Sequence, residues 1–486
     1  MRLSELFREV EFDGSIKNDA DINLVTDDSR LVRPGSLFVC IRHRSFDGHT
    51  AAVDALASGA AAVVTQNRLG LENELRVADS RSAYARLCAA LCNHPERKLR
   101  LIGVTGTNGK TTVTTLIRNI LSDSGTKTLL TGTVCNRLGD ENLPSGLTTP
   151  KPPELYSLLS RAVSQRCKAC VMEASSQALA QGRLEGIDFD AAVFTNITRD
   201  HLDYHGTFEN YISAKKKLFE HSALSIVNLD DPRANEIIAA SKGKIITFST
   251  VLDCADYTAK NISLLSDCVR LELVSKEHIE HIEFASPGLF SVSNAMAAAV
   301  CAINLGMEPK DAAQSLAKSK SVCGRLERVE CSAPYSVIID YAHTPDGLEQ
   351  VLRALRPSCR GKLIVLFGCG GDRDRTKRPL MGAAACKYAD KIIVTSDNPR
   401  TEDPTKIIGD ILKGTDKKRR DLFVEPDRRK AIALALKTAE PGDTVLLAGK
   451  GHEKYQLIGG EKLPLDERET VRKILGLPHD TGRKKQ

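Results

Sequence analysis

Residues 105–112, with the sequence TGTNGKTT, have the composition of a phosphate-binding loop. Gly106 and Gly109 permit backbone angles that let amide N–H groups converge on phosphate oxygens. In such loops a lysine like Lys110 reaches the terminal phosphates of a nucleoside triphosphate, and a hydroxyl like that of Thr111 holds Mg²⁺. The stretch therefore predicts ATP binding, through Gly106, Thr107, Asn108, Gly109, Lys110, Thr111 and Thr112.

A strand and a helix must hold this loop in place, and the flanking residues predict both. Residues 101–104 are apolar and strand-like, and residues 113–121 carry apolar side chains at helical spacing. The positive end of that helix favours bound anions. Val104 stands where the general loop pattern has a glycine, so the loop is a shorter variant. The alternative is an ordinary glycine-containing turn that binds nothing.

Further polar clusters follow other predicted strands of the chain. Glu173 ends one strand, and residues 195–201, 340–345 and 449–453 follow three more. Because ligands of open α/β sheets gather beyond the carboxyl ends of the strands, we expect these clusters to meet at a common site.

Glu173 and His201 are candidate Mg²⁺ ligands beside Thr111, since an oxygen-rich shell with few protein ligands suits a triphosphate-bound ion. His201 and His205 have the spacing of one helical turn, but no further soft or nitrogen ligand completes a zinc site. The lysine run 215–217 sits in an amphipathic helical pattern. A solvated face is the plain interpretation of Lys216 and Lys217.

The order of strand and helix signals predicts an α/β protein of three domains, with borders at 1–98, 99–329 and 330–486. From residue 100 to about 324, strands and helices alternate, which predicts a parallel sheet covered on both faces. Residues 256–285 shift towards a period of two and predict an antiparallel insert. A third α/β run begins near residue 330, and the tail 481–486 is polar.

The composition argues against several classes of protein. Net charge is +6 and Trp is absent, so an aromatic platform for nucleic acid is not expected. We find no apolar run long enough for a membrane span and no apolar segment near the first residues, so neither membrane insertion nor a signal peptide is expected. The 14 cysteines are scattered, which favours reduced thiols in a cytoplasmic enzyme.

Taken together, these motifs resemble the Mur ligases of peptidoglycan synthesis along nearly the whole chain. The resemblance rests on TGTNGKTT from Thr105, EASSQAL from Glu173, NITRDHLDYHG from Asn196, AKKKLF from Ala214, GRLE from Gly324, DYAHTPDGLE from Asp340, FGCGGDRDRTKRPLMG from Phe367, SDNPRTEDP from Ser396 and GKGHEKYQ from Gly449. Each motif alone is modest evidence, whereas their order and spacing are highly specific. One departure is Leu147, where related enzymes can carry a polar Asn.

The resemblance implies a UDP-substrate domain, a central P-loop ATPase and a C-terminal Rossmann-like domain. It implies ATP-dependent addition of meso-diaminopimelate to UDP-N-acetylmuramoyl-L-alanyl-D-glutamate through an acyl phosphate, in a monomer that uses Mg²⁺. The alternatives are a member of the family that adds L-lysine, and a ligase of the folylpolyglutamate synthase type, which lacks the UDP-substrate domain and a pocket like residues 396–404.

The resemblance also implies roles for individual residues. Lys110, Glu173, His201 and Lys215 are catalytic, with Lys215 carbamylated and, like Thr111, Glu173 and His201, positioned for metal. Asn294, Arg325 and His343 join the loop on the nucleotide side. The substrate set is Ser29, Arg44, Ser45, Phe46, Thr148, Thr149, Ser175, Gln181 and Arg183 for the UDP-linked dipeptide, and Arg373, Asp397, Asn398, Pro399, Arg400, Gly449 and Glu453 for the incoming amino acid.

Overall fold

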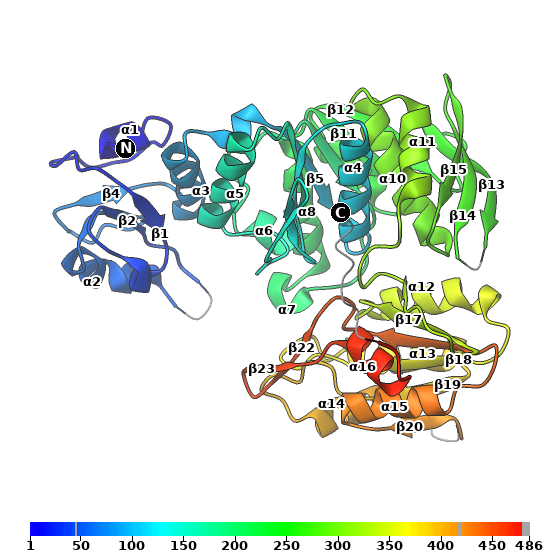
Figure 1. Cartoon of the computed structure of the whole chain (residues 1–486). Coiled ribbons are helices and arrows are strands. Elements are labelled where there is room, and N and C mark those ends of the chain that lie inside the picture. Colours follow the sequence, from blue (N-terminus) through cyan, green and yellow to red (C-terminus); the bar gives the residue numbers. More distant parts are fainter. Residues whose placement is uncertain (44–45, 266, 417–418, 479–486) are drawn as a thin grey trace.

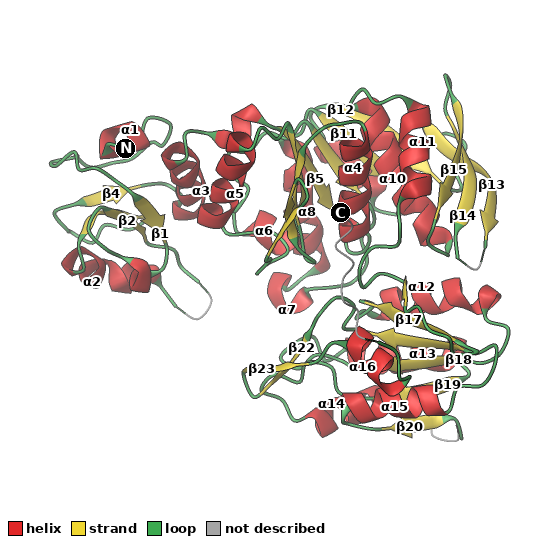
Figure 2. Cartoon of the chain, in the orientation of Figure 1, coloured by secondary structure: helices red, strands yellow, loops and turns green. Residues whose placement is uncertain are grey.

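A computed structural model describes residues 1–43, 46–265, 267–416 and 419–478 of the chain. The described strands form three parallel-rich sheets of 4, 11 and 6 strands and one two-stranded ribbon. Helices pack on each of the three sheets, and the sheets lie in three separate bodies (Figures 1 and 2). The predicted α/β class with three bodies is confirmed.

The N-terminal sheet has the order β1-β2-β3-β4, and all of its strands are parallel. The elements are α1 Leu3–Leu6, β1 Leu24–Thr26, η1 Ser29–Leu31, β2 Ser36–Val39, η2 Gly48–Ala51, α2 Ala52–Ala57, β3 Ala60–Thr65, β4 Glu74–Arg76, α3 Ser80–Leu91 and η3 Pro95–Lys98. Helix α3 packs against α5 (Pro152–Ser164) of the central body. One apolar cluster therefore runs from the N-terminal sheet into the central body.

The central sheet has the order β15-β14-β13-β12-β11-β10-β5-β9-β6-β7-β8. Its strands are β5 Arg100–Thr105, β6 Thr128–Thr131, β7 Asn136–Leu138, β8 Glu141–Leu143, β9 Ala169–Glu173, β10 Ala191–Phe194, β11 Leu224–Asn228, β12 Lys244–Ser249, β13 Tyr257–Leu264, β14 Val269–Val274 and β15 Ile279–Phe284. The predicted parallel arrangement holds from β13 to β6, whereas both edges continue in antiparallel strands. The predicted antiparallel segment thus extends the same sheet.

Helices cover both faces of the central sheet. They are α4 Lys110–Asp123, α6 Ser176–Ala180, α7 Leu202–His205, α8 Phe208–Glu220, α9 Ala234–Ala240, α10 Leu289–Asn304 and α11 Pro309–Lys318, with α5. Helix α4 buries Val113, Leu116, Ile117 and Ile120 against one face. Each such side chain contributes about 1.5–3 kcal/mol, so this packing fixes the start of α4 beside β5.

The C-terminal sheet has the order β16-β17-β21-β18-β19-β20, and only β16 is antiparallel to its neighbour. Its elements are β16 Glu327–Arg328, β17 Ser336–Asp340, α12 Pro345–Leu355, η4 Arg356–Ser358, β18 Leu363–Phe367, α13 Lys377–Tyr388, β19 Lys391–Val394, α14 Pro404–Leu412, β20 Leu422–Val424, α15 Arg428–Lys437, β21 Thr444–Ala448, β22 Tyr455–Ile458, β23 Glu461–Pro464 and α16 Glu467–Ile474.

The domain borders at residues 98 and 329 remain a prediction. Strand β16 precedes the second border and pairs with β17 in the C-terminal sheet, which favours a border a few residues earlier. No described helix is long and apolar enough to cross a membrane. The polar tail 481–486 lies outside the described residues.

Candidate active site

The phosphate-binding loop turns sharply between β5 and α4. Gly106 has φ 152°, and a Cβ there would lie 1.9 Å from Thr195 Oγ1, so only glycine fits. Lys110 Nζ folds back over the loop and donates to the carbonyl oxygens of Gly106 and Thr107, at 2.8 and 2.9 Å. Desolvation lowers the pKa of Lys110. The Lys110 ammonium therefore lies against carbonyl oxygens of its own loop.

Side chains from three other elements brace the loop. The Asn108 amide N–H donates to Asn196 Oδ1 at 3.0 Å, and the Asn108 side chain donates to Asp346 Oδ2 at 3.0 Å across the boundary with the C-terminal body. Asn294 of α10 is buried with its Oδ1 close to Gly109. The loop thus has a fixed shape before any ligand arrives, as preorganised phosphate sites require.

Glu173, at the end of β9, connects the loop to the next strand. Its Oε1 accepts from Thr111 Oγ1 at 3.0 Å and from the Thr133 amide at 2.8 Å, while its Oε2 accepts from Thr133 Oγ1 at 3.0 Å. Arg325 adds a donor to Thr111 Oγ1 at 3.1 Å. A buried carboxylate and a hydroxyl are therefore in contact, and this donor set suits a hard cation that nucleotide oxygens would complete.

His201 caps the short helix α7 with a left-handed backbone, φ 54°. Its Nε2 lies 3.4 Å from Asp200 Oδ2. Desolvation lowers the pKa of His201 to about 4, which leaves a neutral imidazole able to act as a ligand. His205 is instead buried against Ser176 Oγ at 3.0 Å. Within the described residues, no group of three or more His, Cys, Asp or Glu can hold a metal ion by itself.

Lys215 of α8 is completely buried beneath the loop. Its Nζ donates to the Gly106 carbonyl oxygen at 2.8 Å and lies 4.6 Å from the centre of the Tyr211 ring. Among the described residues, no carboxylate lies within ion-pair distance of this amine. Burial, and then the neighbouring charge of Lys110, lower the pKa of Lys215 well below its usual range.

These side chains surround one cavity of about 500 Å³ between the central and C-terminal bodies. The predicted catalytic and nucleotide-side residues all line it: Gly106, Thr107, Asn108, Gly109, Lys110, Thr111, Thr112, Glu173, His201, Lys215, Asn294, Arg325 and His343. Thr148 and Ser175 of the predicted UDP-substrate set line it too. The volume lies in the range of small-molecule sites.

The remaining residues of the predicted dipeptide set form one network behind Glu173. Thr149 Oγ1 donates to the Glu173 carbonyl oxygen at 2.6 Å and to Ser175 Oγ at 3.1 Å. Arg183 donates to the Thr149 carbonyl oxygen at 2.7 Å and, through two nitrogens, to Gln181 Oε1. This network joins the metal-binding candidate to the surface that faces the N-terminal body.

Of the predicted uridine-side residues, the structure describes Ser29 and Phe46, which belong to the N-terminal body (Figure 1) and do not line the cavity. Ser29 begins η1 and is half-buried, and Phe46 is 49% exposed. Arg44 and Ser45 lie outside the described residues. Lys151, two residues after Thr149, pairs with Asp27 at 3.4 Å and so joins the two bodies.

The residues predicted for the incoming amino acid meet at the carboxyl ends of β18, β19 and β21. Asn398 Nδ2 donates to Glu453 Oε2 at 2.9 Å. Gly449 has φ 108°, and a Cβ there would lie 2.5 Å from Asp397 Oδ2, so a side chain would strike the carboxylate. A Cβ on Gly371 would likewise lie 1.9 Å from the Pro399 carbonyl oxygen, so the two loops are in close contact.

Two guanidinium groups lie close to these residues, and together they form a cluster, the predicted amino-acid pocket. Arg400 has a left-handed backbone with φ 55°, and its NH1 donates to the Gly371 carbonyl oxygen at 2.7 Å. Desolvation, and then the charge of the exposed Arg373, lower the pKa of Arg400, while Asp397 and Glu453 act in the opposite direction. The structure therefore brings two cations and two carboxylates together.

Some residues at these sites were not singled out as functional by sequence reasoning. Asn196 and Asp346 brace the phosphate loop, although both belong to motifs that the sequence marks. Lys450 is fully buried at the centre of the amino-acid pocket, beside Glu453 and Asn398. Lys450 also belongs to a cluster that the sequence marks, residues 449–453, where it stands between Gly449 and Gly451 after a buried strand.

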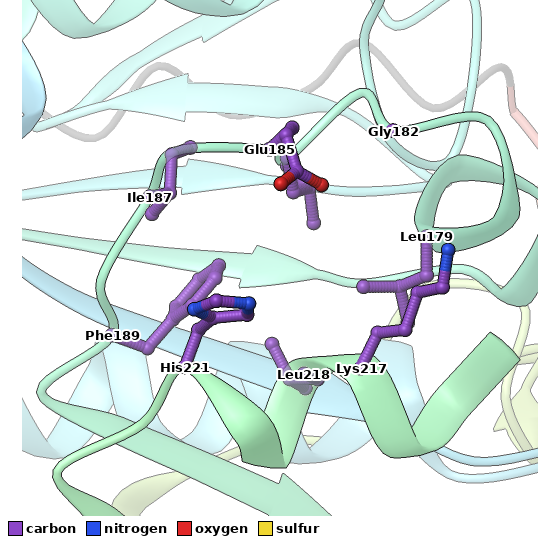
Figure 3. Close-up of a pocket in the computed structure, with 9 residues that line it drawn as sticks. Leu179, Gly182, Glu185, Ile187, Phe189, Lys217, Leu218 and His221 are labelled. Atoms are coloured by element: carbon purple, nitrogen blue, oxygen red, sulfur yellow. The ribbon is translucent and has the colours of Figure 1, made fainter. Parts of the chain in front are cut away.

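A second, much smaller cavity of about 20 Å³ shares no lining residue with the first. Figure 3 shows Lys217, Leu218 and His221, on or just after α8, facing Leu179, Glu185 and Phe189. The space is enough for about one water molecule. The lysine run of α8 therefore divides: Lys215 reaches the large cavity, and Lys217 borders the small one.

Family models match three stretches of the chain. The one described as Mur ligase family, catalytic domain, matches residues 21–90; Mur ligase middle domain matches residues 104–302; and Mur ligase, glutamate ligase domain, matches residues 324–451. Together they reach all three bodies of the structure.

Curated relatives match almost end to end. The UDP-N-acetylmuramoyl-L-alanyl-D-glutamate–2,6-diaminopimelate ligase of Caldanaerobacter subterraneus subsp. tengcongensis is 42% identical over 479 residues, which cover 98% of this chain and 99% of the relative. The relative of the same name from Geobacillus thermodenitrificans is 41% identical and covers 93% of this chain and 94% of its own length.

Solved structures agree. A structure of UDP-N-acetylmuramoyl-L-alanyl-D-glutamate–2,6-diaminopimelate ligase aligns with a TM-score of 0.71 and 35% identity over 98% of this chain and 99% of its own. The MurF ligase of Thermotoga maritima in complex with ADP, at 19% identity, a TM-score of 0.61 and coverage of 93% and 96%, shares the fold alone. On this similarity along nearly its whole length, the chain belongs to the Mur ligase family.

Proposed function

We propose that this protein joins meso-diaminopimelate to UDP-N-acetylmuramoyl-L-alanyl-D-glutamate and converts ATP to ADP and phosphate. The D-glutamyl carboxylate attacks the γ-phosphorus, the bond to ADP breaks, and an acyl phosphate forms. The amino group of diaminopimelate then attacks the acyl carbon, loses a proton and expels phosphate. The reaction would make a peptidoglycan precursor, on which cell shape and division depend.

The observation that carries this proposal is the mixed charge of the amino-acid pocket beside the nucleotide cavity. Arg400 and Arg373 suit the far carboxylate of diaminopimelate, and Asp397 and Glu453 suit its far ammonium. Tyr341 lines the nucleotide cavity and is in electrostatic range of Asp397 and Glu453, so the two sites adjoin. Adjoining sites let the amine reach the activated carboxylate in a single bound state.

On the phosphate side, the chain supplies fixed positive groups. Lys110 and Arg325 both line the cavity where the triphosphate would lie. They stabilise charge that moves onto phosphate oxygens during transfer. Thr111, Glu173 and His201 would hold Mg²⁺, which supplies charge neutralisation on the triphosphate.

We place a carbamate on Lys215. The amine is buried without a carboxylate partner, and its lowered pKa favours the neutral form that reacts with CO₂. The added carboxylate would turn a cation under the loop into an anion facing the same cavity as Glu173 and His201. That anion would help these side chains to position the metal ion.

The UDP end of the substrate would extend towards the N-terminal body. Thr148, Thr149, Ser175, Gln181 and Arg183 would hold the sugar and peptide, while Ser29 and the segment 44–46 would face the uridine. We further propose that the protein acts as a cytoplasmic monomer without nucleic acid or membrane partners.

Phosphate release tests this function. With ATP and Mg²⁺, we expect sustained release only when both the UDP-linked dipeptide and meso-diaminopimelate are present. Sustained release when the UDP-linked dipeptide or diaminopimelate is left out would indicate a simple ATPase. Release with a folate and glutamate instead would indicate folylpolyglutamate synthesis. No release under any combination would indicate a binding protein without catalysis.

A further inference from the structure

The amino-acid pocket contains a buried cation that no role above explains. Lys450 lies between Gly449 and Gly451, and its side chain is 0% exposed. It therefore cannot touch a ligand in this arrangement. Burying an ammonium is costly unless partners compensate, so its position needs a reason.

The Lys450 ammonium donates its hydrogen bonds to residues that are predicted to bind the incoming amino acid. Its Nζ donates to Glu453 Oε2 at 2.7 Å and to Asn398 Oδ1 at 2.9 Å, and Asp397 Oδ1 lies 3.9 Å away. Asn398 in turn donates to the same Glu453 oxygen and accepts from the Leu457 amide at 2.9 Å. The ammonium thus fixes the rotamers of two pocket side chains at once.

The remaining acceptors are the ones that a ligand can use. Both recorded donors to the Glu453 carboxylate go to Oε2, and within the described residues no donor bonds to the Asp397 carboxylate. Glu453 Oε1 and the Asp397 oxygens therefore accept no hydrogen bond within the described part of the chain, which leaves them to an ammonium of the ligand in this proposal. Lys450 offsets one of these two negative charges on the inner side of the pocket, so the other can pair with one ligand ammonium while Arg400 pairs with the ligand's carboxylate.

We propose that Lys450 is a positioning residue that sets the amino-acid specificity of this pocket. It orients Asn398 and Glu453, and it reduces the negative charge beside them so that one ligand ammonium can be paired. Arg400 binds the ligand's carboxylate. The pocket then matches a substrate side chain that ends in both an ammonium and a carboxylate. This inference rests on the proposed function and deepens it.

Lys450→Met should raise the KM for meso-diaminopimelate on the order of 10²-fold, because one partner of a buried charge pair is lost. The KM values for ATP and for the UDP-linked dipeptide should change less than about threefold. A merely structural role would raise all three KM values together or lower kcat alone, and either result would overturn the proposal. So would an unchanged KM for diaminopimelate.

Lys391→Met is the matched control. Lys391 is a buried lysine of β19 in the same body, and its Nζ donates to the Thr438 carbonyl oxygen at 2.9 Å, outside the pocket. We expect it to leave all three KM values within about threefold even where it lowers the melting temperature as much as Lys450→Met does.

A double variant covers the case in which Lys450→Met does not fold. Lys450→Met with Glu453→Gln leaves no unpaired charge from this pair, and its KM for diaminopimelate should match that of Glu453→Gln alone within about threefold. If the two substitutions instead raised the KM for diaminopimelate additively, the proposal that Lys450 acts through Glu453 would be overturned. Failure of the function itself is distinguishable, since the unaltered protein would then ligate no diaminopimelate.

Discussion

Lys215 and Lys450 are both completely buried, but their surroundings differ. Lys215 lies under the phosphate loop and contacts a carbonyl oxygen and an aromatic ring. Lys450 lies under the amino-acid pocket and contacts a carboxylate and an amide oxygen. The comparison teaches that partners, not burial, assign the role: a lysine without an anion is open to modification, and a lysine with one serves as a fixed counter-ion.

The largest expected effect tests the unpaired lysine. Lys215→Ala should lose more than about 10³-fold in kcat, because the carbamate proposed to position the metal ion could not form. A short-chain carboxylate in the buffer should restore part of the rate. Steady-state kinetics with mass analysis of the intact protein for a 44 Da adduct, the mass of the CO₂ gained, would check both parts.

Its control is Lys216→Ala, the next residue of α8, which is only half-buried. That variant should keep near-normal kcat. Equal losses of kcat in Lys215→Ala and Lys216→Ala would show that the two lysines do not differ in role. Residues 215–217 would then be a charged, solvated face of the helix.

The second prediction concerns the cation that remains on the phosphate side. Lys110→Ala should lower kcat on the order of 10³-fold, because the role proposed for its ammonium is to neutralise charge on the transferred phosphoryl group. The KM for diaminopimelate should stay unchanged. Near-wild-type turnover would contradict the assignment of the loop.

The third prediction moves to the amino-acid pocket. Arg400→Ala should raise the KM for meso-diaminopimelate on the order of 10²-fold, because the forked donor for its far carboxylate is lost. Affinity for ATP and the UDP-linked dipeptide should barely change. If nucleotide affinity fell equally, Arg400 would be a structural residue of its turn, which its bond to Gly371 would then explain.

The smallest expected effect tests the network around Glu173. Thr133→Val removes the hydroxyl that donates to Glu173 Oε2 but keeps the backbone amide that donates to Oε1. At the lower end of its range, a hydrogen bond to a charged group is worth about 1.5 kcal/mol, so kcat should fall about tenfold or somewhat more. An unaltered kcat together with an unaltered dependence on Mg²⁺ concentration would show that this contact does not orient the carboxylate.

The phosphate loop could be predicted because its information is local: strand, glycine turn, lysine and helix follow one another within some twenty residues. The rule that parallel strands end at one edge of a sheet predicts that Glu173 meets residues 195–201 in the central sheet and that residues 340–345 meet residues 449–453 in the C-terminal sheet. It does not predict that the edges of the two sheets face each other across the cavity, whose lining does not include residues 449–453. The burial of Lys215 also had a local signal, since Tyr211, Lys215 and Leu218 share one face of α8.

The rest depended on contacts that the sequence does not display. Strands β7 and β8 have three residues each, too few to show a period, so the antiparallel edge was not predicted. Lys450 and Asn398 are 52 positions apart, and Asn108 and Asp346 are 238 apart. Such pairs come together only through the topology of the sheets, and propensity and spacing give no sign of them.

The most direct test of the central claim is a competition for ligation. The unaltered protein, ATP, Mg²⁺ and the UDP-linked dipeptide are mixed with equimolar meso-diaminopimelate, L-lysine and L-glutamate, and the product is identified by mass. A pocket that pairs Arg400 with a far carboxylate should give the diaminopimelate product and reject L-lysine by about 10⁴ in kcat/KM. Efficient formation of the L-lysine product would contradict the account of the amino-acid pocket, and a product from L-glutamate would contradict the assigned reaction.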